Sequence, residues 1–144
     1  MTLEEIWKNW SVDSKIDPIE LGNAALAIPQ LHNKYWQFLS RERLAAVKLR
    51  QEFVTFYANK VAWAKNELTT QELADLGWTV NLKRYLKSEI DEVLKSDKDV
   101  INYNLRVAMA DEKIEALKDI IKMISNRSFQ VSNAIAWNKF KSGG

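Results

Sequence analysis

Three cations surround an aromatic residue in the segment KRYLK at residues 83–87. Cationic side chains neutralise phosphates, and an aromatic ring beside them can stack on an unpaired base. The segment falls in residues 77–87, which lack helical periodicity and which we interpret as a loop. Most of the other aromatic residues fall on apolar stripes, where core packing is the better interpretation. The candidate contacts for single-stranded nucleic acid are Lys83, Arg84, Tyr85 and Lys87.

A second set of cations lies in residues 29–66, where seven basic residues face two acidic ones, a net charge of +5. The flanking stretches 1–28 and 67–99 each carry −3, and residues 100–144 carry +3. Such cations can simply extend their apolar stems over a hydrophobic stripe. Their excess over carboxylates is nevertheless typical of a polyanion partner. Six of them border the apolar face of the helical wheel: Lys34, Arg41, Lys48, Arg43, Arg50 and Lys65.

Two charged residues, Glu42 and Lys60, fall near the centre of the same apolar stripe. A charge in that position requires a partner. One interpretation is an ion pair with another subunit. For Lys60, the alternative is a phosphate contact inside a groove, and the helical wheel does not choose between them.

The composition argues against enzymatic chemistry. The chain has no Cys, four Gly and a single His, His32, which we interpret as structural. Disulfides, thiol nucleophiles, multi-histidine metal sites and glycine-rich phosphate loops are therefore excluded. The carboxylate pairs lie on expected solvated faces: Glu4/Glu5, Glu89/Glu92 and Asp111/Glu112. We expect no enzyme activity, no metal and no cofactor.

Capping signals divide the chain into helices without strand-like alternation, which predicts an all-α fold. The helix starts are marked by capping boxes at Thr2 and Thr69, by Asp17 before Pro18, by Ser88, and by Asp97 or Ser96. The expected helices cover about 2–10, 18–27, 29–67, 70–77, 88–95 and 97–141.

The 144 residues suggest a single helical domain over 1–144, in four parts: 1–28, 29–67, 68–96 and 97–141. A compact domain of this size is under about 40 Å across. A helix of about 38 residues is roughly 57 Å long. We therefore expect an elongated hairpin of two long helices with short accessory helices, whose core is completed by other copies of the chain.

The last long helix carries a heptad seam that starts at Val100 and is flanked by further apolar positions. So wide a stripe indicates more than one neighbour, as in a bundle or an assembly. The residues predicted to mediate assembly are Val107, Ile114, Leu117, Ile121, Ile124, Val131 and Ile135.

Residues 84–100, RYLKSEIDEVLKSDKDV, resemble the UvsY family of recombination mediator proteins from T4-like phages. The C-terminal run ISNRSFQVSNAIAWNKFKSG is similar to the variant found in marine relatives, as are LHNKY at 31–35 and the Leu-Gly pair at 21–22. The resemblance spans nearly the whole chain. The matching residues of the first segment are Arg84, Tyr85, Lys87, Ser88, Glu89, Val93, Leu94 and Asp97 to Val100.

The resemblance implies an all-α, ring-like homo-oligomer that binds single-stranded DNA without sequence preference and hydrolyses no nucleotide. It implies two phage partners, the single-strand-binding protein, whose hold on DNA is weakened, and the UvsX recombinase, whose filament is nucleated. The family's DNA-binding cations lie late in the long helix, which corresponds here to Lys60, with Lys48, Arg50 and Lys65 nearby. The family's C-terminal region is associated with self-assembly.

We therefore expect a recombination mediator in the cytoplasm of an infected bacterial host. The chain has no apolar run long enough to cross a membrane, and its acidic N-terminus does not resemble a signal peptide. The alternative is an oligomeric helical scaffold that binds only proteins, through the contact of its basic helix with an acidic tail.

Overall fold

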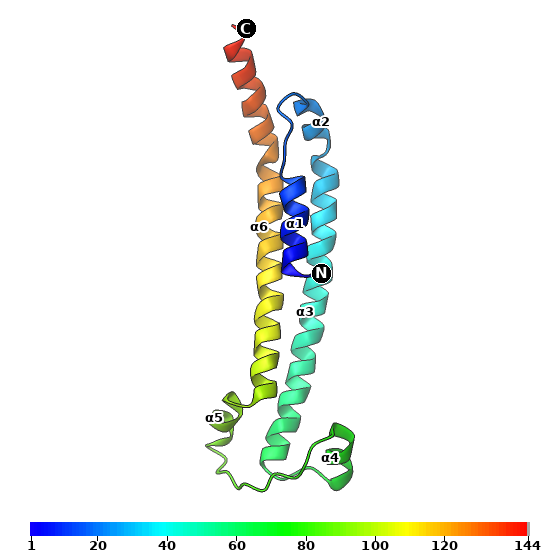
Figure 1. The fold of residues 1–144 in the computed structure, drawn as a ribbon, viewed down its shortest axis with the longest axis vertical. Helices are drawn as coiled ribbons and strands as arrows, with labels where there is room; N and C mark the ends of the chain where they lie inside the picture. Colours follow the sequence, from blue (N-terminus) through cyan, green and yellow to red (C-terminus); the bar gives the residue numbers. More distant parts are fainter. Residues whose placement is uncertain (144) are drawn as a thin grey trace. The chain divides into compact units, whose positions relative to one another are not determined.

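The computed structural model describes residues 1–143, and every regular element in that range is a helix (Figure 1). The all-α class expected from the sequence is therefore confirmed. The helices are α1 (Leu3–Asp13), α2 (Leu21–Leu26), α3 (Ile28–Ala64), α4 (Thr70–Leu76), α5 (Ile90–Lys95) and α6 (Lys98–Lys141).

The chain forms two compact units. The first combines residues 1–45 with 110–144, and the second consists of residues 46–109. In the first unit, α1 lies alongside the parts of α3 and α6 that belong to it (Figure 1). Its buried apolar residues are Ile6, Leu21, Tyr35, Leu39, Ile114, Leu117, Ile120, Ile124 and Val131.

The C-terminal end of α1 is fixed by polar contacts around Asp13. Its Oδ2 accepts hydrogen bonds from Lys34 Nζ at 2.7 Å and from the Tyr35 hydroxyl at 2.8 Å. Arg127 donates from Nη2 to the backbone carbonyls of Asp13 and Ser14, each at 2.9 Å. Burial raises the pKa of Asp13, but the hydrogen bonds from Lys34 and Tyr35 and the nearby cations lower it by more. The net result is a pKa below the usual value for Asp.

Glu42, expected to pair with another subunit, is paired within its own chain. Its carboxylate lies 2.9 Å from Lys113 Nζ and 3.7 Å from the amino group of Met1. Lys113 also donates to the Met1 carbonyl at 3.1 Å. The intersubunit interpretation was wrong because a helical wheel does not show that the start of the chain packs beside Glu42.

The second unit is built around the end of α3. A small apolar cluster of Ala64, Ile90 and Leu94 joins α3 to α5. An aromatic cluster joins α3 to α6. The ring of Tyr103 stacks on that of Phe53, with centroids 5.4 Å apart, and its centroid lies 4.8 Å from that of Phe56. Further buried apolar residues of this unit are Ala46 and Val100.

Three of the expected helix starts are confirmed. Thr2 with Glu5 and Thr69 with Glu72 form complete capping boxes, with hydrogen bonds in both directions. Asp97 caps α6 by accepting the backbone N–H groups at positions 99 and 100. These starts were predictable because a cap depends on residues that are adjacent in sequence.

Two other starts were placed wrongly. Asp17 does not cap α2, because its side chain accepts the N–H of Ile19 at 2.9 Å in a turn that precedes the helix. The helix consequently begins at Leu21 instead of Pro18. Ser88 does not cap α5 either, since that helix begins at Ile90 and shows no side-chain cap.

Two helix ends also differ from the expected bounds. Helix α1 continues to Asp13, past the break expected at residue 11, because its last turn packs against α3 and α6. Helix α3 ends at Ala64, three residues early, since Asn66 adopts the left-handed conformation with φ 55°. The backbone then closes with a hydrogen bond from Glu67 N–H to the Ala62 carbonyl at 2.9 Å.

Candidate nucleic-acid interface

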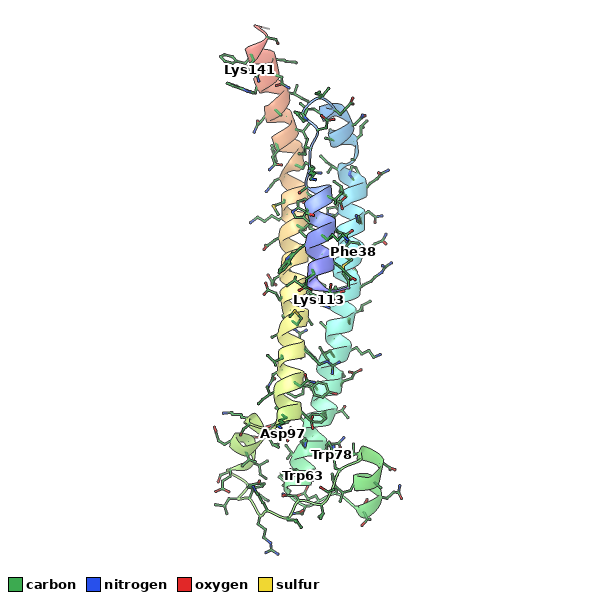
Figure 2. The ribbon with its side chains drawn as sticks, in the orientation of Figure 1. Phe38, Trp63, Trp78, Asp97, Lys113 and Lys141 are labelled. Atoms are coloured by element: carbon green, nitrogen blue, oxygen red, sulfur yellow. The ribbon has the colours of Figure 1, made fainter. Side chains whose placement is uncertain are left out.

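Lys60, the central cation of the basic helix, is buried in the second unit. Its Nζ lies 3.1 Å from Asp97 Oδ2 and 3.8 Å from Asp99 Oδ2. It also lies 4.7 Å from the ring centroid of Trp78 and 4.9 Å from that of Trp63. Figure 2 labels Trp63, Trp78 and Asp97 in this unit. The carboxylate partner of Lys60 is thus in the same chain, which corrects the intersubunit alternative, and its charge is already balanced.

The site around Lys60 is held by contacts of the segment that follows α4. The indole N–H of Trp63 donates to the Thr79 carbonyl at 2.7 Å, and the Asn81 side chain donates to the Ala64 carbonyl at 3.1 Å. Gly77 takes the left-handed conformation that ends α4, with φ 70°. These contacts fix the loop against the end of α3 and bring Trp78 to Lys60.

The pKa of Asp97 is lowered, although burial alone raises it. The hydrogen bond from Lys60 is the largest lowering cause, followed by the N–H groups of Val100 and Asp99. The carboxylate is therefore ionised at neutral pH and pairs with the Lys60 side chain. This ion pair links α3 to the start of α6, and Lys60 is only 8% exposed.

The exposed cations of the second unit belong to α3 and to the loop between α4 and α5. Apart from Lys60, the six cations predicted to contact DNA are all exposed to solvent. Those on α3 and just after it are Lys48, Arg50 and Lys65, and those of the loop are Lys83, Arg84 and Lys87. The second unit thus contains the loop cations and three of the six cations that border the apolar face, whereas Lys34, Arg41 and Arg43 belong to the first unit.

Tyr85 does not stand out from the loop as a stacking platform. Its ring packs against the apolar cluster of Ala64, Ile90 and Leu94 and is half-buried. A loop residue can turn its side chain inward, which the local sequence does not show, and the role of Tyr85 as a base contact stays a prediction. Core packing, the interpretation given to most aromatics, applies to Tyr85 as well.

A groove of about 490 Å³ lies on the second unit beside Lys48. Its apolar surface includes Phe56, Leu76 and Tyr103, and polar side chains from α3 surround it. The groove combines aromatic rings, amide groups, the cation of Lys48 and the carboxylate of Glu52, so it can contact an unpaired base but offers a phosphate no net positive charge. The polar lining residues are Gln51, Glu52, Thr55 and Asn59.

Most of the predicted assembly residues of α6 already pack within the chain. Four are buried, Ile114, Leu117, Ile124 and Val131, and two are half-buried, Val107 and Ile121. Only Ile135 of this set is exposed, at 39% of its surface. The heptad seam therefore serves chiefly as the intrachain core, and assembly through it stays a prediction for Ile135.

Arg127 is a buried structural anchor that sequence reasoning missed. It is 5% exposed, and its guanidinium lies 5.7 Å from the Trp10 ring centroid while it donates to the end of α1. The available signal was its spacing: Ile120, Ile124 and Val131 share its helical face, which predicts an inward position.

Within residues 1–143, no group of three or more His, Cys, Asp or Glu side chains is arranged to hold a metal ion. In the same range, no helix has the length and apolar character needed to span a bilayer.

Comparison with known proteins identifies similar chains. Residues 9–144 match the family described as recombination, repair and ssDNA binding protein UvsY. Crystal structures of the bacteriophage T4 recombination mediator protein UvsY have a similar fold. The lattice type II structure superposes with a TM-score of 0.84 at 19% identity, covering 99% of this chain and 98% of that one. None of the curated proteins matches the sequence significantly.

Two further crystal forms of the T4 protein give the same result. Lattice type IV has a TM-score of 0.84 at 17% identity, covering 97% of this chain and 99% of that chain. Lattice type I has a TM-score of 0.81 at 18% identity, covering 95% and 98%. At these identities the likeness establishes the fold.

Proposed function

Because the chain belongs to the UvsY family of recombination, repair and single-stranded-DNA-binding proteins, we propose that it is a recombination mediator that binds single-stranded DNA without sequence preference. The observation that carries the proposal is the set of six exposed cations gathered in the second unit. Flexible cations on a surface contact phosphates, which are the same in every sequence.

Useful affinity in this proposal comes from several copies of the chain. One unit offers few phosphate contacts, and a ring-like homo-oligomer multiplies them through effective concentration. Exposed apolar residues on α6 support such an assembly, because large exposed apolar side chains are typical of interaction surfaces. They are Ile101, Leu105, Met109, Met123, Phe129, Ile135, Trp137 and Phe140.

The proposed partners are single-stranded DNA, the phage single-strand-binding protein and the phage UvsX recombinase, in the cytoplasm of the host. In this proposal the protein weakens the hold of the single-strand-binding protein on DNA and loads the recombinase. It carries out no catalysis of its own and needs no cofactor. Its contribution is to hold the DNA strand in place while one protein replaces the other.

The test is binding of a fluorescently labelled oligo-dT across a salt series, read by anisotropy, with the mass of the protein measured by light scattering. We expect a large oligomer whose log affinity falls with log salt by about 0.7 per phosphate contacted. A slope near zero, or no binding at low salt, contradicts the proposal.

A charge-matched pair of variants locates the interface. Changing Lys83, Arg84 and Lys87 to Gln should weaken binding and reduce the salt slope by about 2, or 0.7 for each lost contact. The control changes three exposed lysines of the first unit to Gln and removes the same net charge. These are Lys8, Lys118 and Lys122. Equal losses in both variants would mean that the loop is no specific interface.

One observation favours a protein-binding scaffold as the second candidate. The loop that carries the cations also exposes Val80, Leu82 and Leu86, at 56%, 91% and 68% of their surfaces. Aliphatic side chains offer no ring for stacking on bases, and together with cations they suit an acidic, apolar peptide. A large oligomer without salt-sensitive DNA affinity would favour this scaffold.

A further inference from the structure

The groove of about 490 Å³ on the second unit is lined by aromatic rings from two helices. Phe56 of α3 and Tyr103 of α6 form its apolar lining together with Leu76, the last residue of α4. Both rings are half-buried, so part of each is open to the groove. Ligand sites in proteins typically have this size and combine aromatic walls with a few polar groups.

Further aromatic contacts hold the two rings in place. Phe56 meets the Trp78 ring edge-on, with centroids 5.8 Å apart, and Tyr103 stacks on Phe53 with centroids 5.4 Å apart. Rings that are already ordered lose little conformational entropy when a ligand stacks on them. The aromatic part of the groove is therefore preformed.

The polar part of the groove comes from one face of α3. Gln51, Thr55 and Asn59 recur every four residues and so lie along the same side of the helix. Their amides each carry donors and an acceptor, and the hydroxyl can do either. Lys48 and Glu52 complete this lining with opposite charges. The groove therefore suits a flat, neutral ligand whose edge carries both donors and acceptors.

We propose that this groove is a stacking site for an unpaired nucleobase of single-stranded DNA, which lies against the rings of Phe56 and Tyr103. The amides of Gln51 and Asn59 meet the edge of the base, and Arg106 meets an adjoining phosphate. Arg106 is exposed, and its guanidinium carbon lies 5.1 Å from the Tyr103 centroid. The inference rests on the proposed DNA-binding function and adds a base-contacting element to it. Every base has a flat face, and an amide can donate or accept, so the contact carries no sequence preference.

A base suits this groove better than an apolar side chain of another protein chain. An apolar side chain would cover the rings but would leave the amides of Gln51 and Asn59 without hydrogen bonds, which costs free energy. An unpaired base supplies both a flat face and a polar edge. The groove also lies in the compact unit that holds the six exposed cations, so a strand bound to their surface brings its bases to the same unit.

A matched pair of double variants separates contact with bases from contact with phosphates. Thr55→Leu/Asn59→Leu places aliphatic side chains in the groove and changes neither a ring nor a charge. The control, Val54→Leu/Ala58→Leu, makes the same substitutions one residue earlier, at exposed positions outside the groove lining. Affinity is measured by anisotropy at a fixed salt concentration, for a labelled oligo-dT and for an abasic oligomer of the same length.

We expect wild type and the control to prefer oligo-dT over the abasic strand. The groove variant should bind oligo-dT more weakly by about fivefold or more, as the loss of base stacking predicts, and should bind the abasic strand unchanged. Its mass by light scattering should equal that of wild type.

A second measurement uses the unchanged protein. An oligo-dT that carries 5-iodo-deoxyuridine couples on irradiation to an aromatic ring in contact with the base, and mass spectrometry of the digested protein identifies the coupled residue. We expect coupling at Phe56 or Tyr103. If the groove variant fails to fold, this result decides by itself.

Several results would overturn the inference. They are equal binding of both strands by wild type, an unchanged preference in the groove variant, and coupling of the iodinated base only at other residues. A lower mass of the folded groove variant would also overturn it, because the groove would then face another copy of the chain. Failure of the proposed function looks different, because wild type would then bind neither strand.

Discussion

A buried lysine carries much of the organisation of the second unit. Lys60 lies among two carboxylates and two indole rings, so its ammonium group has exchanged water for fixed partners. The attraction between a cation and an aromatic ring becomes stronger when the pair is removed from solvent. These contacts give Lys60 a structural role in the second unit, and a phosphate contact by Lys60 or by its exposed neighbours stays a prediction.

Replacement of Lys60 by Met tests this role. The change leaves Asp97, whose side chain is 19% exposed, without its cation. We expect the free energy of unfolding to fall by about 2–3 kcal/mol, which denaturant titration followed by circular dichroism can measure. The salt slope for DNA should stay unchanged, whereas a direct phosphate contact would lower it by about 0.7.

The pH dependence of stability provides a control for the same ion pair. The ordinary pKa of an Asp is 3.8, and that of Asp97 lies lower in the folded chain. Its contribution is therefore fully present above about pH 4 and is lost as the pH falls through the folded pKa. The difference in the free energy of unfolding between wild type and Lys60→Met should become smaller below pH 3.8. A constant gap would mean that packing of the lysine stem, and not its charge, stabilises the unit.

The need of Lys60 for a partner was predictable, but the partner was not. A charge at the centre of an apolar stripe requires compensation, and the wheel of α3 shows this directly. Asp97 lies at the start of another helix, and its approach depends on how the intervening loop closes. The same limitation explains Tyr85, whose inward orientation is set by Ile90 and Leu94.

At the scale of helices, starts fixed by adjacent residues were predictable and tertiary anchors were not. The capping boxes at Thr2 and Thr69 follow from local spacing. The end of α1 depends on Arg127, which is more than a hundred residues away and supplies donors to two backbone carbonyls. No window of sequence around α1 contains that information.

The variant Arg127→Met tests this anchor of α1. It should leave the carbonyls of Asp13 and Ser14 without their donor and lower the free energy of unfolding by about 2 kcal/mol. Hydrogen exchange should show the loss of protection first in α1. Lys122→Met, at an exposed position of the same helix, is the control. It should change neither the free energy of unfolding nor the protection of α1 from exchange. Uniform loss of protection throughout the chain would contradict a local anchor.

At the scale of the whole molecule, the proposed assembly surface must be sought among the residues that the chain leaves exposed. The heptad pattern treats all apolar positions of α6 alike, although most of them already pack within the chain. An Asp at Ile114 would destabilise the chain itself, since that residue is only 9% exposed. Self-association therefore needs a probe at an exposed position.

Leu105→Asp is such a probe, because the side chain is 64% exposed. We expect a lower mass by light scattering and a free energy of unfolding within about 0.5 kcal/mol of wild type. Ile19→Asp, at an apolar residue that is 87% exposed before α2, should leave the mass unchanged. An unchanged mass for Leu105→Asp would remove this part of α6 from the proposed interface.

The cap of α6 has a consequence for which substitutions the chain can tolerate. Asp97 uses one carboxylate oxygen for the backbone of α6 and the other for Lys60. Asn preserves an oxygen for the cap but offers Lys60 no charge, and Glu preserves the charge but is too long to cap well. Two demands on one short side chain leave almost no acceptable replacement, so in a random mutational library position 97 should be among the most depleted, ahead of many larger apolar residues of the core.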